Sequence, residues 1–278
     1  MSGKLYVVAT PIGNLGDLSP RALETLRTVD FIAAEDTRVG AKLLNRFDLH
    51  TPQISYFEHN RRQKGEQIVA RLLAGESCAL ITDAGTPAIS DPGTDLVALC
   101  AAAAVEVVAV PGCCAAAAAL SVSGLECGRF TFEGFLSTTP KNRREHLCAV
   151  KDEPRTMVFY EAPHKLLRTL TDMLACWGDR SLALCREITK LHEEVRRTTL
   201  REAVAYYTEN PPRGEFVLVI APAAHTEADA APPDLLGEVG ALLDGGASLK
   251  DAVQQVSRAH SMPKNSLYQE ALRAFGRK

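Results

Sequence analysis

The chain has 278 residues, of which 46% are hydrophobic and 23% are charged, and its formal net charge is −3. This length and apolar fraction are sufficient for more than one folded core. The net charge excludes a generally basic nucleic-acid-binding protein, and the longest apolar run, 101–110, contains Glu106 and is too short to cross a bilayer.

The cysteine pattern bears on metal binding and on the cellular compartment. Eight cysteines lie at positions 78, 100, 113, 114, 127, 148, 176 and 185. They form no Cys-x-x-Cys pair, so the spacing does not predict a zinc site. Several lie in apolar segments, where a free thiol behaves as a small hydrophobic group. With no signal-peptide pattern, we expect a protein of the reducing cytoplasm that needs neither a membrane nor a metal.

Strand-like and helix-like segments alternate in the first half of the chain. We expect strands at 5–9, 31–34, 78–82 and 105–110. Ser19-Pro20 is typical of a helix start, and Asn60 is expected to cap a second helix that ends at Gly75. Alternating β and α segments with apolar strands predict a mostly parallel sheet that is covered on both faces.

Two of these strands run into loops rich in glycine and proline. The first loop, 10–16, has the sequence Thr-Pro-Ile-Gly-Asn-Leu-Gly, and the second loop, 83–93, contains two glycines and two prolines. Such loops bring bare backbone close to a ligand above the edge of a sheet. Two of them predict a shared crevice. A third segment, 111–119, ends in five alanines, which fits either a tightly packed helix or a wall that leaves room for a ligand.

The pattern changes near residues 129–136, and we place a domain boundary between 120 and 135. Strands are then expected at 155–160, 181–187, 193–199 and 215–220, with helices at 163–176 and 200–208. The stretch 181–199 is typical of a hairpin, so this sheet should be mixed. Residues 222–233 have the composition of a linker, and three short helices are expected at 234–244, 248–260 and 263–275.

The predicted fold class is therefore α/β, in three parts. An N-terminal α/β domain at 1–122 has a mostly parallel sheet, a second α/β domain at 123–222 has a mixed sheet, and a helical tail at 233–278 resembles a helix-turn-helix unit. The sequence contains no GxxxxGK[ST], no GxGxxG after the first strand, no HExxH and no GxSxG. These absences remove the common nucleotide, dinucleotide, metalloprotease and serine-hydrolase sites from consideration.

Six motifs, in this order, carry a resemblance to a known family. They lie at 9–18, 34–38, 81–93, 159–165, 186–194 and 214–220. Over residues 4 to about 221 the chain resembles the tetrapyrrole-methylase superfamily, and within it the bacterial branch that methylates the ribose 2′-oxygen of one cytidine in 16S ribosomal RNA. The resemblance implies two α/β domains of that type, S-adenosylmethionine folded into the cleft between them, and a homodimer.

The resemblance also implies which residues bind the cofactor. They are Pro11, Ile12, Gly85, Thr86, Pro87, Ile89, Ser90, Gly112, Cys114, Ala115, Tyr160, Glu161 and Gly214. Relatives usually have Pro-Ser where this chain has Cys113-Cys114, and a thiol is a weaker hydrogen-bond donor than a hydroxyl. A side-chain contact at this point is therefore less favourable here, whereas a backbone contact is unaffected.

Polar residues of the same motifs are candidates for catalysis and for RNA binding. Glu35 or Asp36 can accept the proton of a ribose hydroxyl, with Arg38 and Lys190 positioning phosphate. The alternative is that one carboxylate caps the next helix and Arg38 pairs with it, and Asp83 can likewise only order its own loop. Candidates for substrate binding are Tyr56, His59, Arg61, His164, Arg186, Lys190 and His192.

Three functions stay open at this level. The first is the ribose methyltransferase, acting on ribosomal RNA or on the small ribosomal subunit, and the second is a sister enzyme acting on a corrin precursor or a protein side chain. The third is a non-enzymatic nucleic-acid-binding protein. The motif at 186–194 and the basic residues of the tail favour RNA, the latter being Lys250, Arg258, Lys264, Arg273, Arg277 and Lys278. The elaborated crevice argues against a pure binding protein.

Overall fold

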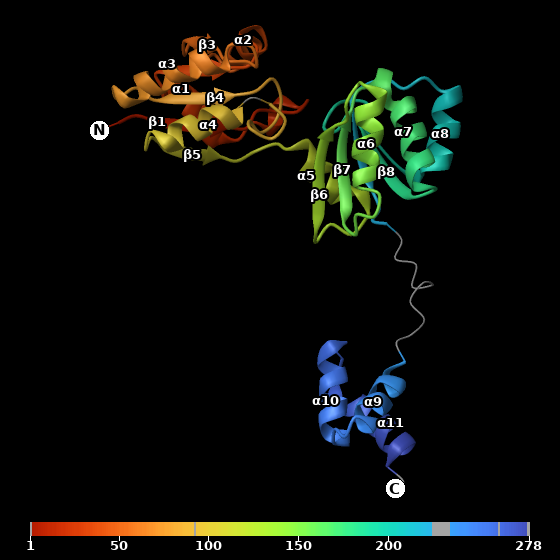
Figure 1. Ribbon diagram of the computed structural model, residues 1–278. Helices are drawn as coiled ribbons and strands as arrows, with labels where there is room; N and C mark the ends of the chain where they lie inside the picture. The colour runs from red at the N-terminus through yellow and green to blue at the C-terminus, as the bar shows by residue number, and fades with distance from the viewer. Residues whose placement is uncertain (1, 92, 224–233, 261, 277–278) are drawn as a thin grey trace. The chain divides into compact units, whose positions relative to one another are not determined.

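A computed structural model of the chain describes residues 2–91, 93–223, 234–260 and 262–276. The chain divides into two compact units, residues 1–223 and 224–278 (Figure 1). Among the described residues, the first unit holds two five-stranded sheets and the second holds three helices. Most of the expected linker lies outside the described residues, as do Arg277 and Lys278.

The first sheet is entirely parallel and has the strand order β3-β2-β4-β1-β5. Its strands are β1 (Lys4–Val8), β2 (Phe31–Ala34), β3 (Gln53–Ser55), β4 (Cys78–Ile81) and β5 (Glu106–Val110). Every residue of β2 and β4 is buried, as expected for strands covered on both faces. The predicted parallel sheet is confirmed.

Helices cover both faces of this sheet. They are α1 (Pro20–Thr28), α2 (Thr37–Arg46), α3 (Arg61–Leu73) and α4 (Gly93–Ala102), and a short 3-10 turn, η1, spans Leu15–Asp17. α1 and α2 pack with Ile32 and Ile81 on one face, whereas α3 and α4 pack with Phe31 and Leu80 on the other. Adjacent residues of β2 and β4 thus point to opposite cores.

The helix ends agree with the sequence in all but one detail. Ser19 caps α1, because its hydroxyl accepts a hydrogen bond from the backbone of Ala22. Gly75 follows the end of α3 with a φ of 102°, which favours glycine. Asn60 occupies the cap position of α3, but its side chain accepts from Phe57 N instead of a helix N–H, so the expected cap bond is wrong.

The second sheet is mixed, as predicted, with the order β6-β7-β10-β8-β9. β6 pairs with β7 in parallel, and the other pairs are antiparallel, including the expected β8–β9 hairpin. The strands are β6 (Phe130–Phe135), β7 (Thr156–Glu161), β8 (Ser181–Arg186), β9 (Glu194–Thr199) and β10 (Phe216–Ile220).

The helices of the second sheet separate two cores. On one face lie α6 (Pro140–Ala149), α7 (Pro163–Trp177) and α8 (Leu200–Glu209), which pack on Phe159 and Leu218. On the other face lies the alanine-rich helix α5 (Ala115–Ser123), which packs on Val158 and Val217. The small side chains of α5 form a tightly packed face, although the helix belongs to the first expected domain by its position in the chain. We call residues 2–114 the first lobe and residues 115–223 the second lobe.

The second unit contains α9 (Leu235–Asp244), α10 (Leu249–Ala259) and α11 (Lys264–Phe275), close to the predicted helices. Ser248 caps α10 as expected. The helices share a small apolar core that includes Val239, Val253 and Leu267. Throughout the part of the chain that the structure describes, every helix is too short or too polar to span a bilayer.

Candidate active site between the two sheets

The two Gly/Pro loops bond directly to each other. Thr10 N donates to the carbonyl of Gly85 at 2.9 Å, and Gly85 N donates to the carbonyl of Thr10 at 3.1 Å. Gly85 has a φ of 87°, and a Cβ atom there would lie 3.3 Å from a methyl group of Ile12. The loops after β1 and β4 therefore form one rim at the carboxyl edge of the first sheet, and glycine is required at their contact.

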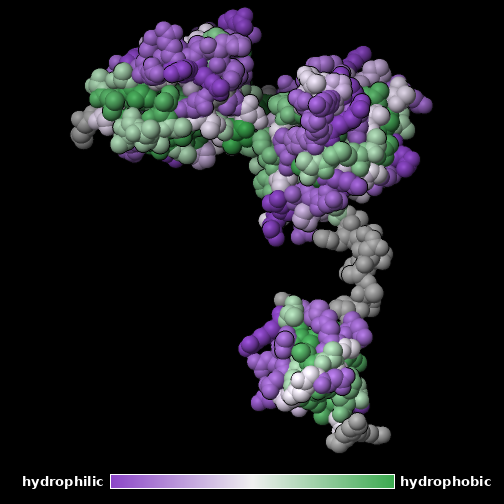
Figure 2. Space-filling model, viewed as in Figure 1, coloured by the Kyte–Doolittle hydropathy of each residue, from purple (hydrophilic) through white to green (hydrophobic). Residues whose placement is uncertain are grey.

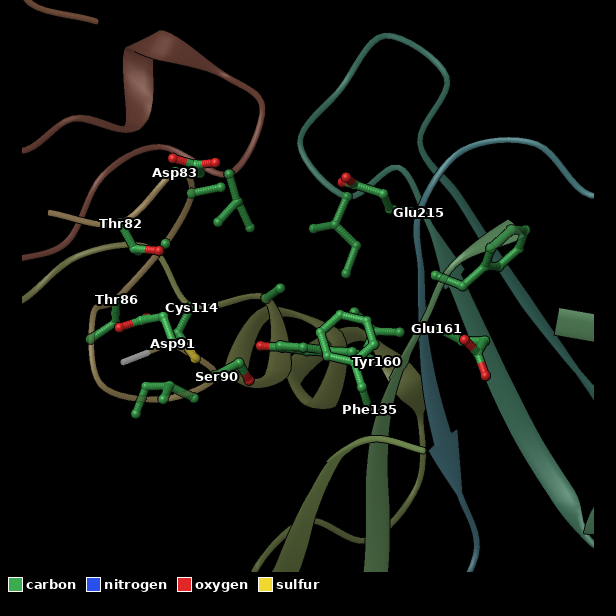
Figure 3. Close-up of a pocket in the computed structure, with 18 of the residues that line it drawn as sticks. Thr82, Asp83, Thr86, Ser90, Asp91, Cys114, Phe135, Tyr160, Glu161 and Glu215 are labelled. Carbon is green, nitrogen blue, oxygen red and sulfur yellow. The ribbon is translucent and has the colours of Figure 1, made fainter. Parts of the chain in front are cut away.

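A first pocket of about 400 Å³ opens beside this rim and is lined by both lobes (Figure 3). Figure 3 shows Thr82, Asp83 and Thr86 facing Tyr160 and Phe135 across it. Nine of the thirteen residues expected to bind the cofactor line this pocket, namely Ile12, Gly85, Thr86, Ile89, Ser90, Cys114, Ala115, Tyr160 and Glu161. The other four, which do not line it, are Pro11, Pro87, Gly112 and Gly214.

Hydrogen bonds fix the walls of the first pocket. The hydroxyl of Thr86 donates to the carbonyl of Cys113 at 2.8 Å, and the phenol of Tyr160 accepts from Ala116 N, in the first turn of α5, at 3.1 Å. Burial raises the pKa of Tyr160 to about 12, so it stays a neutral phenol. Asp91 Oδ1 accepts from Ala88 N and Gly93 N, each at 2.9 Å, and so holds the second loop in shape.

The first pocket is strongly acidic. It is lined by a single basic residue, Lys190, and by six carboxylates: Glu35, Asp83, Asp91, Glu161, Glu187 and Glu215. Lys190 donates to Glu187 at 2.8 Å and to Glu215 at 2.9 Å, so its charge is already compensated. Burial raises the pKa of Asp83, with a further rise from the charge of Glu35, and burial likewise raises that of Asp91. This electrostatic environment favours a cationic ligand.

The three residues expected to be catalytic occupy different places. Asp36 caps α2, since its Oδ1 accepts from Arg38 N at 2.8 Å, and the guanidinium of Arg38 forks onto the same carboxylate. These bonds lower the pKa of Asp36 to about 2. Glu35 lines the first pocket and accepts a hydrogen bond from the hydroxyl of Thr82 at 2.6 Å. The expected capping by Asp36 is thus present, while the catalytic assignment stays a prediction.

The expected substrate-binding residues do not gather at one place. Lys190 lines the first pocket, whereas the side chain of Tyr56 is 1% exposed and belongs to the core of the first lobe. Arg61 pairs with Glu58 and Asp95. The other four candidates line neither this pocket nor the second pocket described below. Three of them are exposed histidines, His59, His164 and His192, and the fourth, Arg186, donates a hydrogen bond to Glu194.

A second pocket of about 540 Å³ adjoins the first and shares six lining residues with it, namely Ile12, Thr82, Asp83, Ala84, Lys190 and Glu215. Its remaining wall comes from the first loop, with Pro11 and Gly13, and from α2, with Lys42 and Arg46. The sequence motifs predict neither a role for these two cations nor the shared position of Asp83. The spacing of Arg38, Lys42 and Arg46, four residues apart, was the available signal.

Comparison with known proteins agrees with this architecture. Residues 4–204 match the family model of the tetrapyrrole (corrin/porphyrin) methylases. The chain is 51% identical over 272 residues to the ribosomal RNA small subunit methyltransferase I of Synechocystis sp., with 97% of this chain and 98% of that protein covered. The protein of the same name from Escherichia coli O157:H7 is 44% identical, with 99% and 96% covered.

Solved structures share the fold at low sequence identity. The methyltransferase CobJ superposes with a TM-score of 0.60 and 20% identity, over 80% of this chain and 95% of that one. The uroporphyrin-III C-methyltransferase from Thermus thermophilus, solved in complex with S-adenyl homocysteine, gives a TM-score of 0.55 and 17% identity, over 78% and 97%. The match of the family model and the nearly full-length relatives show that this chain belongs to the tetrapyrrole-methylase family, together with the proteins named ribosomal RNA small subunit methyltransferase I.

Proposed function

We propose that this protein transfers a methyl group from S-adenosylmethionine to the ribose 2′-oxygen of a cytidine in 16S ribosomal RNA. The observation that carries the proposal is the acidic first pocket, which lies at the carboxyl edge of the first sheet and is closed by the second lobe. Relatives that are 51% and 44% identical over nearly the whole chain are named for ribosomal RNA, which supports the choice of substrate. The choice of the ribose 2′-oxygen as the methylated atom and of cytidine as the nucleotide rests on the resemblance of the sequence motifs to the family.

The chemistry of the pocket fits the cofactor. S-adenosylmethionine, when bound, supplies an electrophilic methyl group on a positively charged sulfur. Carboxylates dominate the charged part of the lining and the one basic side chain is already paired, so a cation is not repelled. Apolar and aromatic side chains, such as Ile12, Ile89 and Tyr160, offer surfaces for the uncharged parts of a nucleoside.

Asp83 is the best-placed proton acceptor in the site. Asp83 lines both pockets, whereas Glu35 lines only the first and Asp36 lines neither. Burial raises the pKa of Asp83, which makes it more basic than an ordinary aspartate and far more basic than Asp36. We therefore assign to Asp83 the removal of the proton from the ribose hydroxyl.

The predicted pair Glu35 and Asp36 then acts by positioning Asp83. Asp36 N donates to Asp83 Oδ1 at 3.1 Å, and Glu35 accepts from the hydroxyl of the neighbouring Thr82. The fork between Arg38 and Asp36 holds the first turn of α2, and with it the N–H that orients Asp83. In this arrangement the turn after β2 holds the carboxylate of Asp83, the proton acceptor, at the wall that the two pockets share.

The test of the function maps 2′-O-methyl groups on 16S ribosomal RNA from cells with and without this protein. We expect a single cytidine to lose its methyl group when the protein is removed, and purified protein with S-adenosylmethionine to restore it on small ribosomal subunits. Binding of S-adenosylhomocysteine is measured in parallel by calorimetry. The protein could bind S-adenosylhomocysteine, leave the 2′-O-methyl groups of the RNA unchanged and methylate uroporphyrinogen III. That combination of results would favour the sister enzyme.

A homodimer in the cytoplasm is part of the same proposal. Both statements rest on the family resemblance and on the ribosomal substrate that the names of the relatives give. Analytical ultracentrifugation of the purified chain tests the first statement, with a sedimenting mass of twice 30.0 kDa as the expected result. A single species at the mass of one chain would contradict it.

A further inference from the structure

The second pocket differs from the first in charge, although the two share a wall. Besides the shared residues Asp83, Lys190 and Glu215, its charged lining consists of Lys42 and Arg46, and it lacks the other four carboxylates of the first pocket. Lys190 is neutralised by its two glutamate partners, one of which, Glu215, also lines the second pocket. The positive charge that is free to act in the second pocket therefore comes from α2.

Lys42 and Arg46 are exposed, and their side chains have no hydrogen-bond or ion-pair partner among the described residues. They lie one helical turn apart, so both extend from the same side of α2. Arg38, one turn earlier, is held by Asp36 and contributes no free charge. Figure 2 shows hydrophilic residues over the part of the first lobe where Figure 1 places α2 and α3.

The second lobe closes this pocket on its other side. A Cβ atom at Gly13 would lie 2.4 Å from Cγ of Lys190 and 3.1 Å from the hydroxyl of Thr189, so the first loop and the loop after β8 touch there. Lys190, held by this contact and by its two glutamates, forms part of the wall between the pockets. A ligand in the second pocket therefore has Asp83 and Lys190 on the side of the first pocket, and Lys42 and Arg46 on the side of α2.

We propose that the second pocket receives the target nucleotide of the RNA, and that Lys42 and Arg46 bind its phosphate oxygens. The inference rests on the proposed function and places the nucleotide that accepts the methyl group in the second pocket. An anionic phosphate meets the two uncompensated cations of α2, while the ribose meets Asp83 at the wall shared with the acidic pocket. The contrast in charge between the two pockets separates a cationic methyl donor from an anionic acceptor.

The test compares Lys42→Ala, Arg46→Ala and the double variant with the wild-type protein. Methyl transfer is assayed on small ribosomal subunits from cells lacking this protein, and equilibrium binding to free 16S ribosomal RNA is measured over a range of salt concentrations. We expect KM for the subunits to rise about tenfold in each single variant, because a charged hydrogen bond to phosphate is lost, with kcat little changed. The slope of log affinity against log salt should fall by about one for each cation removed.

Three controls separate phosphate binding from general charge effects and from loss of the fold. Arg21→Ala removes an exposed arginine of α1, a helix on the same face of the sheet, that lines neither pocket, and it should leave KM unchanged. Lys42→Arg keeps the charge and should restore most of the affinity. The affinity for S-adenosylhomocysteine, measured by calorimetry, should be the same in every variant, since neither Lys42 nor Arg46 lines the first pocket.

The outcomes distinguish this inference from the proposed function. Wild-type KM and an unchanged salt slope in the double variant overturn the phosphate role of α2, even if the wild-type protein methylates the subunits. If the wild-type protein does not methylate them, the proposed function fails. If the double variant loses binding of uroporphyrinogen III but keeps its binding of RNA, the two cations bind the carboxylates of a tetrapyrrole and not phosphate. That result would also overturn the inference.

Discussion

Asp83 shows how a residue acquires a role that its place in the sequence does not reveal. In the motif it is one of two acidic residues of the loop 83–93, and ordering of that loop is sufficient to explain its presence there. In the structure it lines both pockets and receives a hydrogen bond from the backbone of Asp36. Partial burial and the neighbouring charge of Glu35 raise its pKa. Glu35 and Asp83 lie 48 positions apart in the chain, so the sequence pattern alone does not place them side by side.

At the residue scale, Asp83→Asn should abolish most of the turnover while leaving the fold intact. We expect kcat for methyl transfer to fall by about 10²–10⁴-fold, the usual contribution of a general base. Because the raised pKa means that the folded state disfavours the charged carboxylate at neutral pH, Asn should also leave the melting temperature unchanged or higher. The measurements are single-turnover kinetics and calorimetric unfolding.

The pH profile and two neighbouring variants complete that test. In the wild-type protein, kcat should fall as the pH drops through the raised pKa of Asp83, that is, at a higher pH than an ordinary aspartate would give. Asp36→Asn should lower kcat less than Asp83→Asn does, because the carboxyl group of Asp36 has a pKa of about 2 and is a weak base. Full activity of Asp83→Asn would transfer the role to Glu35, for which Glu35→Gln is the matched variant.

At the element scale, helix starts and sheet type were largely predictable, because they depend on neighbouring residues. Ser19 and Ser248 cap their helices as expected, and the apolar runs of β2 and β4 indicated a sheet buried on both faces. The parallel pairing of β6 with β7 inside an otherwise antiparallel sheet depends on segments that lie far apart in the chain, so local sequence patterns do not predict it. Likewise, helical spacing puts Lys42 and Arg46 on one side of α2, but it does not say which pocket that side meets.

The capping box of α8 offers a test at this scale. Thr199 Oγ1 accepts from Glu202 N at 3.3 Å, and the carboxylate of Glu202 accepts from Thr199 N at 3.4 Å. Thr199→Ala should lower the free energy of unfolding by about 1 kcal/mol, the usual cost of losing such a cap. Thr208→Ala, at an exposed position within the same helix, is the control, and alanine there should be neutral or stabilising. Urea unfolding measures both, and equal midpoints for the two variants would contradict the role of the cap.

At the scale of the whole molecule, the site and the helical tail belong to different compact units. Every residue that lines either pocket lies between Thr10 and Val217, inside the first unit. The described part of the tail carries five acidic residues against four lysines and arginines, so its charge is nearly balanced. The expectation that a basic tail favours RNA therefore depends on Arg277 and Lys278, which lie outside the described residues.

Removal of the chain after residue 223 tests this division. The shortened protein should fold, because both sheets and their cores are complete within it. Its dissociation constant for S-adenosylhomocysteine should stay within about twofold of the full-length value, which corresponds to a difference of less than about 0.5 kcal/mol. Calorimetry measures the affinity and circular dichroism the fold. A folded fragment that no longer binds this ligand would show that the pocket needs the tail.

The thiol of Cys114 gives the first pocket a nucleophile that a serine at the same position would not provide. Its side chain lines the pocket and is partly exposed, whereas Cys185, which also lines the pocket, is buried with a pKa raised to about 11. Sulfur is a softer and stronger nucleophile than a hydroxyl oxygen. A nucleoside analogue that carries a mild electrophile near this wall would therefore be captured irreversibly here, and it would spare relatives that have serine at the same place.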